Sequence, residues 1–187
     1  MSVTPRTTRT TAAAVAVAAA ALLAPAAAAS AHDGHDHDDA PASATHSRAA
    51  VGGLVAEVRR ATAQYRDVQV ALDAGYVPVS GCETSPDGGM GIHYLNPGLV
   101  APGAPVDPAT PQILLYGPDA EGGLRLLGVE YWQPAVGQPT PVLGGRPFDG
   151  PMPGHSPDMP VHYDLHVWTE VANPDGVFAA WNPHVTC

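Results

Sequence analysis

Residues 160–171, PVHYDLHVWTEV, combine a β-strand pattern with side chains that can do chemistry. Successive side chains of a strand point to opposite faces of a sheet. One face of this strand therefore carries two imidazoles, a carboxylate and an indole, those of His162, Asp164, His166 and Trp168. Imidazole and carboxylate groups bind transition metals and exchange protons. Such a face is either a functional site or a polar surface in contact with solvent.

Two further strand-like segments each carry one ionisable residue on the face that aliphatic side chains do not line. His93 lies in MGIHYL, residues 90–95, and Glu130 lies in LRLLGVEYW, residues 124–132. If the strands are neighbours, these two residues converge with His166. Two histidines and one carboxylate are the ligands of mononuclear Zn, Fe or Mn centres that keep positions open for water or substrate. Without a metal, the same three residues are typical of a general acid–base pair oriented by a carboxylate.

Aromatic side chains accompany these ionisable residues. Trp132 and Trp168 share their face, which argues against a face that is simply solvated, and Tyr94 directly follows the first histidine. Two long segments rich in proline and glycine, residues 96–111 and 133–160, are expected to fold over this face. The predicted result is a pocket for a metal ion or a small molecule.

His155 is a further candidate pocket residue, in MPGHSPDMP between Met152 and Met159. Histidine with soft thioether ligands suits Cu(I). The pattern is equally typical of a loop histidine flanked by methionines that fill gaps. His162 is expected nearer the edge of its strand than His166, and it is not assigned as a ligand.

Residues 32–47, HDGHDHDDAPASATHS, have no apolar periodicity and are predicted to be a disordered tail. Short His/Asp tracts bind Cu(II), Zn(II) or Ni(II), because imidazole suits these ions and a flexible chain can wrap them. Three histidines within this tract form a candidate tail metal site: His32, His35 and His37. The alternative is a solvated acidic linker whose histidines have no function.

Residues 1–31 have the features of a secretory signal peptide. Arg6 and Arg9 precede an uncharged alanine-rich run, and the small residues AAAASA offer cleavage sites after Ala29 or Ala31. The apolar run is too short and too close to the N-terminus to favour a membrane span. The sequence therefore predicts a secreted, extracytoplasmic protein.

Charge and length restrict the function further. The chain has 187 residues, no lysine and a formal net charge of −10. Loss of the signal peptide removes two arginines and no acidic residue, so the charge becomes −12. A chain this acidic is a poor candidate for binding nucleic acid or anionic lipid. Residues 48–187 are long enough for a single domain with its own core, and the oligomeric state is left open.

The two cysteines are Cys82 and Cys187, the last residue of the chain. In an oxidising compartment such a pair is expected to form a disulfide, and only one pairing exists. Two thiolate metal ligands are the rival interpretation. It is disfavoured because no CxxC or Cys–His spacing accompanies the two residues.

The elements that position these side chains follow from periodicity. Apolar residues recur at helical spacing over residues 48–74, which predicts one long amphipathic helix. Strands are predicted over 90–95, 112–117, 124–132 and 161–171, with GPDAEGG as a hairpin loop and 177–181 as a short last strand or turn. The expected fold is α+β: one N-terminal helix packed on an antiparallel sheet of four to six strands, with long Pro/Gly-rich loops.

From about Ala61 to Cys187 the chain resembles a family of secreted, functionally uncharacterised bacterial proteins. The resemblance rests on GMGIHYLNPGLV, LRLLGVEYW and YDLHVWTEVANPDGVFAAWNPHVTC, which match the order M-G-x-H-Y, G-V-E-Y, Y-x-L-H-V-W, N-P-x-G and W-N-P. In proteins of this kind an apolar residue often replaces His162. The resemblance implies one fold and one polar cluster, and no reaction, substrate or cofactor.

Three functional hypotheses follow. The first is a secreted protein that binds a divalent metal, copper or zinc, through His93, Glu130 and His166, with the tail histidines recruiting the ion. The second is an extracellular metal-dependent enzyme, a hydrolase or a catalyst of oxygen chemistry, using the same pocket. The third is a structural or interaction domain without metal, whose histidines only satisfy hydrogen bonds.

Overall fold

The structure is a computed structural model that describes residues 42–187. The predicted signal peptide, residues 1–31, lies outside the described residues. The same holds for the candidate tail site of His32, His35 and His37. Of the predicted tail, only residues 42–47 are described, and they are helical.

The first apolar pattern folds as three helical segments, so the single helix predicted over residues 48–74 is wrong in its start and in its continuity. The segments are α1 (Ala42–Thr62), the 3₁₀ helix η1 (Ala63–Arg66) and α2 (Val68–Asp73). Asp67 interrupts the helix because its backbone is extended (φ −89°, ψ 114°) and its side chain caps α2 by accepting a hydrogen bond from Gln69 N. The interruption changes the helical phase. Ala71 is buried, whereas Leu72, expected on the apolar face, is 38% exposed.

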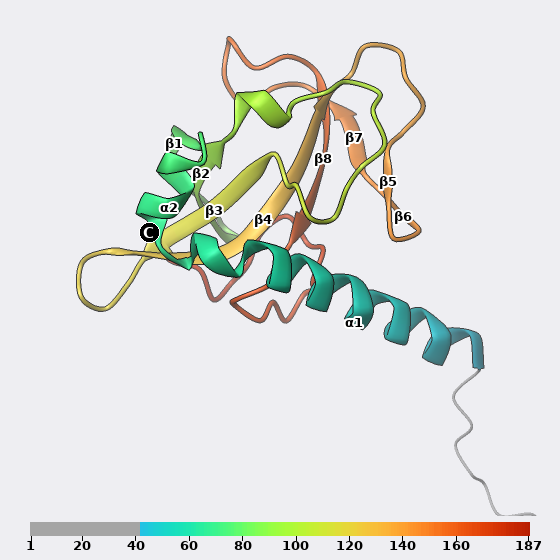
Figure 1. Cartoon of the computed structure of the whole chain (residues 1–187), viewed down its shortest axis with the longest axis horizontal. Coiled ribbons are helices and arrows are strands. Elements are labelled where there is room, and N and C mark those ends of the chain that lie inside the picture. The colour runs from blue at the N-terminus through green and yellow to red at the C-terminus, as the bar shows by residue number, and fades with distance from the viewer. Residues whose placement is uncertain (1–41) are drawn as a thin grey trace, which may run out of the picture. The chain divides into compact units, whose positions relative to one another are not determined.

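Six strands form one antiparallel sheet (Figure 1). In chain order they are β1 (Val77–Ser85), β2 (Gly88–Leu95), β3 (Ile113–Pro118), β4 (Leu124–Pro134), β7 (Asp149–Met152) and β8 (His162–Val167). Their order in the sheet is β1-β2-β3-β4-β8-β7. The short strands β5 (Val142–Leu143) and β6 (Arg146–Pro147) pair with each other. The predicted α+β class with an antiparallel sheet is confirmed.

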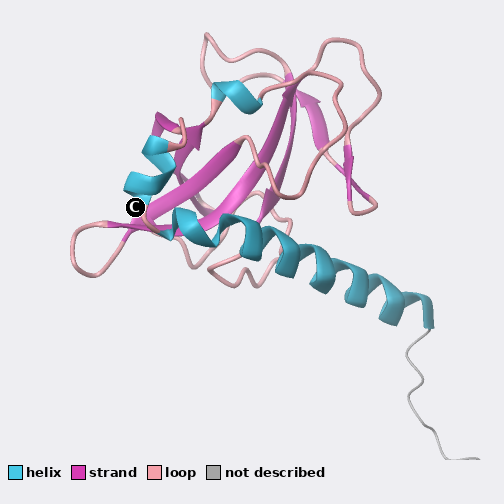
Figure 2. Cartoon of the chain, in the orientation of Figure 1, coloured by secondary structure: helices cyan, strands magenta, loops and turns pink. Residues whose placement is uncertain are grey.

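Four of these strands, β2, β3, β4 and β8, correspond to predicted ones, and the predicted hairpin loop joins β3 to β4. β1 was missed because its register is broken between Pro78 and Cys82, which hides the alternation. The short strands β5, β6 and β7 lie within residues 133–160, where the sequence predicts only a long loop. Residues 177–181 form turns and no strand. Figure 2 shows long loops between the strands, one of which contains the short 3₁₀ helix η2 (Pro97–Leu99).

Both faces of the sheet are largely buried along its central strands β2, β3, β4 and β8. On one face, Leu54 and Val58 of α1 pack into a core with the aromatic and aliphatic side chains of alternating strand positions, among them Tyr94, Leu114, Tyr116, Val129, Tyr131, Tyr163 and Leu165. The opposite face has its own apolar cluster of Ile113, Leu115, Leu127, Trp132, Trp168 and Val185. The prediction that this second face is not simply solvated is therefore confirmed. It is the face that carries the ionisable residues.

Both long loops and the C-terminal segment cover this second face. Val100 from the first loop and Met159 from the second pack against its apolar cluster. The C-terminal segment adds Val185 and is held to the sheet at its start, where Trp168 N donates a hydrogen bond to Val177 O. Near its end, Asn182 forms a bridge with Gly89. The expectation that loops fold over the face is confirmed, but much of the cover comes from the C-terminal residues.

One β-bulge changes a predicted side-chain orientation. Simple alternation places Leu127 on the same face as Val129 and Tyr131. In the structure Leu115 pairs with Gly128 and Tyr116 pairs with Leu126, so Leu127 is an extra residue between the two pairs. Leu127 therefore joins the apolar cluster on the opposite face.

Arginines of the helical segments connect the two layers. Arg59 Nε donates a hydrogen bond to Thr169 O at 2.7 Å, and Arg66 pairs with the Glu170 carboxylate at 3.0 Å. Thr169 and Glu170 directly follow Trp168, so these contacts hold the end of β8 in place.

The predicted disulfide is confirmed: Cys82 of β1 is bonded to Cys187, with their Cα atoms 5.7 Å apart. The bridge spans 105 positions of the sequence. A closed loop of that length is worth about 4–5 kcal/mol in the chain-entropy description of disulfide stabilisation. Among the described helices, none is long and apolar enough to cross a membrane.

Candidate metal centre

The sheet register brings His93, Glu130 and His166 together on the second face. Glu130 on β4 and His166 on β8 are direct cross-strand partners. His93 on β2 pairs with Leu115, and Glu130 pairs with Ile113, so β3 lies between them. The His93 and Glu130 side chains therefore meet above β3, whose apolar Ile113 and Leu115 side chains lie on the same face.

The distances within this group are short. His93 Nε2 lies 3.3 Å from Glu130 Oε2, and His166 Nε2 lies 3.8 Å from the same oxygen. One ligand atom from each residue lies within 4.8 Å of the other two. The two imidazole rings are perpendicular, with centroids 6.4 Å apart. The predicted convergence of the three residues is therefore present in the structure.

Hydrogen bonds at the β1 bulge orient His93. The Ser80 hydroxyl donates its proton to Gly81 O at 2.7 Å and accepts a hydrogen bond from His93 N. A 3.0 Å contact between the Ser80 hydroxyl and His93 Nδ1 holds the ring in place, with its direction set by the tautomer of the imidazole. Nε2 of His93 faces the Glu130 carboxylate. A proton or a cation at Nε2 makes that contact favourable, and a bare lone pair does not.

Two buried atoms of the group have no hydrogen-bond partner among the described residues. They are Glu130 Oε2 and His166 Nε2, which face each other. The side chains of Glu130 and His166 are only 5% and 2% exposed. A buried polar atom without a partner costs about 1–3 kcal/mol, so native proteins rarely leave two in one place without a function.

Charged neighbours within the group shift the pKa of His93 and the pKa of Glu130. Burial acts to lower the pKa of His93, but the close contact with the Glu130 carboxylate and its negative charge outweigh burial, so the pKa of His93 is raised. Burial acts to raise the pKa of Glu130, but His166 and His93 outweigh it, so the pKa of Glu130 is lowered. Glu130 is therefore held as a carboxylate, the form that binds a cation.

Trp168 supports the group from one side. Its indole stacks on the His166 ring, with centroids 6.2 Å apart and planes 23° apart. The indole is itself fixed, because its Nε1 donates a hydrogen bond to Ala179 O at 2.6 Å. Locked neighbours of this kind hold a ligand in one orientation and lower the cost of binding an ion.

The other predicted pocket residues are placed differently. The prediction of Tyr94 as a pocket residue is wrong. Its side chain lies on the face of the sheet that α1 covers, where its ring packs against Tyr116. Trp132 lies on the second face, where it packs against His162 with ring centroids 5.6 Å apart. His155 is exposed and lies outside the group of three, but its ring contacts the His162 ring.

His162 is the first residue of β8 and so lies nearer the end of the strand than His166, as expected, but it is buried. It is 1% exposed, because β8 lies between β4 and β7 and His162 pairs with Pro134 on one side and Met152 on the other. Its Nε2 lies 3.6 Å from Asp164 Oδ2. The sequence signal for this pair was visible, since both residues share the His166 face, but β7 was not predicted and so the burial was missed.

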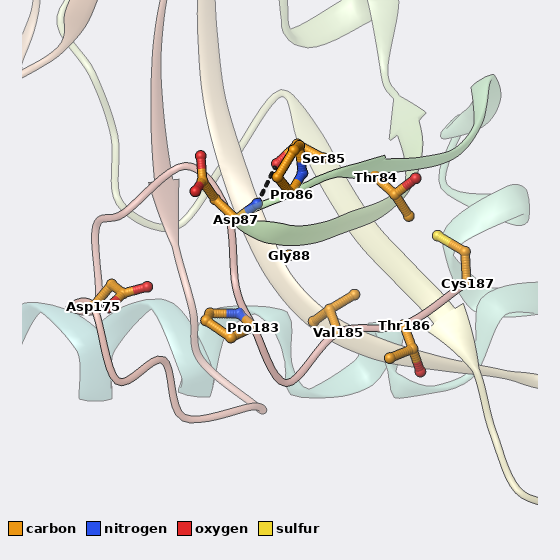
Figure 3. A pocket seen from close by; sticks show the side chains of 10 residues that line it. All are labelled: Thr84, Ser85, Pro86, Asp87, Gly88, Asp175, Pro183, Val185, Thr186 and Cys187. Carbon is orange, nitrogen blue, oxygen red and sulfur yellow. Dashed lines mark hydrogen bonds between the residues drawn. The ribbon is translucent and has the colours of Figure 1, made fainter.

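A surface pocket of about 540 Å³ lies beside the disulfide (Figure 3). It is lined by the turn between β1 and β2, by Asp175 and by the last residues of the chain. Neither the three residues of the candidate centre nor any of the buried polar atoms without a partner belong to this lining. This pocket therefore adds no residue to the candidate centre.

We compared the chain with protein-family models, with curated protein sequences and with solved structures. None of the three comparisons found a match. The argument for function therefore rests on the geometry of the site.

Proposed function

We propose that this protein is a secreted protein that binds one divalent transition-metal ion, zinc or copper, through His93, Glu130 and His166. The observation that carries the proposal is the pair of buried, unpartnered atoms, Glu130 Oε2 and His166 Nε2, facing the oriented Nε2 of His93. A cation at this point would satisfy all three atoms at once. The disulfide between Cys82 and Cys187 is compatible with an oxidising compartment.

The ligand set argues for the ion class. Two imidazole nitrogens and one carboxylate oxygen suit zinc and copper better than the hard ions Mg²⁺ and Ca²⁺, which prefer oxygen ligands. Ser80 would act as the outer partner that fixes the His93 ring, an arrangement common around metal-bound histidines.

Binding is favoured over catalysis as the function. Three protein ligands leave a fourth position, which an enzyme would use for water and substrate. Here Glu130 and His166 are almost fully buried, and only His93 has some exposure, 13% of its side chain. This burial fits retention of an ion better than access of a substrate.

The test is a metal titration of the full chain in which His32, His35 and His37 are replaced by asparagine, so that the tail does not contribute. Zn²⁺ binding is measured by calorimetry and elemental analysis, with and without Glu130→Gln. We expect Glu130→Gln to weaken binding at this site by at least about 100-fold, since even outer partners of a ligand are worth about 10- to 100-fold. The control is His184→Ala, an exposed histidine outside the group. Equal affinity in Glu130→Gln and in the parent protein would overturn the proposal.

A further inference from the structure

The C-terminal strap, residues 177–187, holds Trp168 against the candidate metal centre. Trp168 donates two hydrogen bonds to the strap, one from its backbone N to Val177 O at 3.0 Å and one from its indole Nε1 to Ala179 O at 2.6 Å. The same indole stacks on the ring of His166, with centroids 6.2 Å apart. The strap therefore fixes the side chain that orients one of the three proposed ligands.

The strap lies directly on the start of β2. Gly89 and Asn182 exchange two backbone hydrogen bonds, each of 3.1 Å, and Val185 packs in the apolar cluster of the second face. A Cβ atom at Gly89 would lie 2.7 Å from Val185 O, and one at Gly88 would clash with the backbone of Asn182. The backbone of the strap thus fills the space that side chains would take at these two glycines.

A disulfide ties the end of the strap to the sheet. Cys187, the last residue, is bonded to Cys82 of β1. Cys82 pairs with Ile92, the residue before His93, and it lies two positions after Ser80, which contacts the His93 ring. The disulfide therefore joins two segments that each orient a different ligand of the centre.

The disulfide can be approached from solvent. Cys187 is exposed and Cys82 is partly exposed. The surface pocket of about 540 Å³ lies beside Cys187, between the strap and the turn that joins β1 to β2 (Figure 3). An external thiolate has room to reach the bond from this side, and access is one of the conditions for thiol–disulfide exchange.

We propose that the disulfide is a redox latch on the metal centre: its reduction frees the strap and speeds release of the ion. A dithiol reductant attacks Cys187 Sγ as a thiolate, the S–S bond breaks and Cys82 leaves as a thiolate. The second thiol of the reductant then displaces Cys187. Two electrons and two protons pass from the dithiol, which becomes a disulfide, to the protein, which gains two thiols. The inference rests on the proposed metal site and adds its regulation.

The size of the effect follows from the contacts of Trp168. Once the strap is free, the indole loses the acceptor that holds it, and the His166 ring loses a fixed neighbour. Outer partners of metal ligands are worth about 10- to 100-fold in affinity. We therefore expect the dissociation rate of Zn²⁺ to rise at least about tenfold when the disulfide is opened.

The experiment compares Zn²⁺ release from oxidised and disulfide-free protein, in the full chain with asparagine at the three tail histidine positions. Release into excess chelator is followed by stopped flow, and hydrogen exchange of backbone amides is measured on the same samples. One disulfide-free form carries Cys82→Ser and Cys187→Ser. The other is folded parent protein that has been reduced by a phosphine and alkylated, so the comparison does not depend on folding of the serine variant. Neither form offers a thiolate as a metal ligand.

We expect at least about tenfold faster release from both forms. The amides of Asn182 and Val185 should exchange faster, while those of β3 and β4 keep their protection, which separates release of the strap from general unfolding. Incubation of the folded parent with a dithiol, followed by alkylation and mass spectrometry, should show both cysteines modified. A disulfide that resists the dithiol while the fold is intact would overturn the latch.

A variant with the disulfide intact tests the strap itself. Gly89→Ala, whose Cβ displaces the strap, should also speed Zn²⁺ release, and its matched control is Gly53→Ala, where a Cβ meets nothing within 4 Å. Release at the oxidised rate from both disulfide-free forms, or a strap that stays protected in them, overturns the latch and leaves the proposed function standing. A parent protein whose Zn²⁺ binding does not depend on Glu130 overturns both proposals.

Discussion

Bound metal should stabilise the fold by an amount that follows from the site. Glu130 Oε2 and His166 Nε2 are buried without hydrogen-bond partners. One buried polar atom without a partner costs about 1–3 kcal/mol, and a bound ion can recover a cost of that size. An ion present at 100 times its Kd raises the free energy of unfolding by about 2.7 kcal/mol, which lies within this range. For a domain of this size, that corresponds to a rise in Tm of about 8 °C, at about 3 °C per kcal/mol.

The assay is differential scanning calorimetry of the full chain with asparagine at the three tail histidine positions. One sample contains a chelator and the other contains Zn²⁺ at 100 times the Kd measured by titration. The parent protein and His184→Ala should both show the rise in Tm. Glu130→Gln should lose most of it, because the buried carboxylate is the shared partner of both imidazoles.

Two results would refute this reasoning. One is an unchanged Tm of the parent protein at saturating Zn²⁺, which would mean that the ion binds folded and unfolded chains equally. The other is the same rise in Tm for Glu130→Gln and for the parent, which would place the stabilising ion elsewhere.

Two further predictions concern the sheet that carries the site. Gly91→Ala should lower the free energy of unfolding by at least about 2 kcal/mol and weaken Zn²⁺ binding, because Gly91 has φ +86° and a Cβ there would lie 2.4 Å from Tyr116 O. Its matched control is Gly53→Ala, where a Cβ meets nothing within 4 Å. This substitution should raise the free energy of unfolding by about 0.5–1 kcal/mol, because alanine favours the helix over glycine. Equal urea midpoints for the two variants would contradict the prediction. The second prediction concerns three tyrosines of the helix-face core whose pKa is raised by burial: Tyr76, Tyr116 and Tyr131. A raised pKa favours the neutral phenol in the folded state, so its contribution to stability is complete below the unfolded pKa of about 10 and is lost as the pH rises above it. Tyrosinate absorbance and circular dichroism recorded together should show these phenols ionising only as the fold is lost, and ionisation near pH 10 with an intact fold would show that burial does not hold them.

Local sequence pattern was sufficient to predict part of this structure. Alternation placed His93, Glu130 and His166 on the faces they occupy, because the period of two in a strand is a property of the backbone alone. The disulfide followed from the presence of only two cysteines. The α+β class followed from a helical period and then strands separated by turn residues.

Long-range contacts decided the rest. Alternation does not reveal that Glu130 is opposite His166, or that His93 reaches Glu130 across β3, because register depends on hydrogen bonds between segments far apart in the sequence. The extra residue at Leu127 reverses its orientation for the same reason. His162 is buried because β4 and β7 pair with β8 on either side and Trp132 packs against its ring.

In the helical region, too, local pattern predicts one part of the structure and long-range packing decides the other. Its apolar period is local and predicts helix throughout, but the side chain of Asp67 competes by capping a new helix at Val68. The new phase buries Ala71 in the helix-face core and leaves Leu72 exposed. The sequence by itself determined which side chains could share a face. Only the tertiary structure decided which of them meet, because packing and strand pairing join residues that no local period connects.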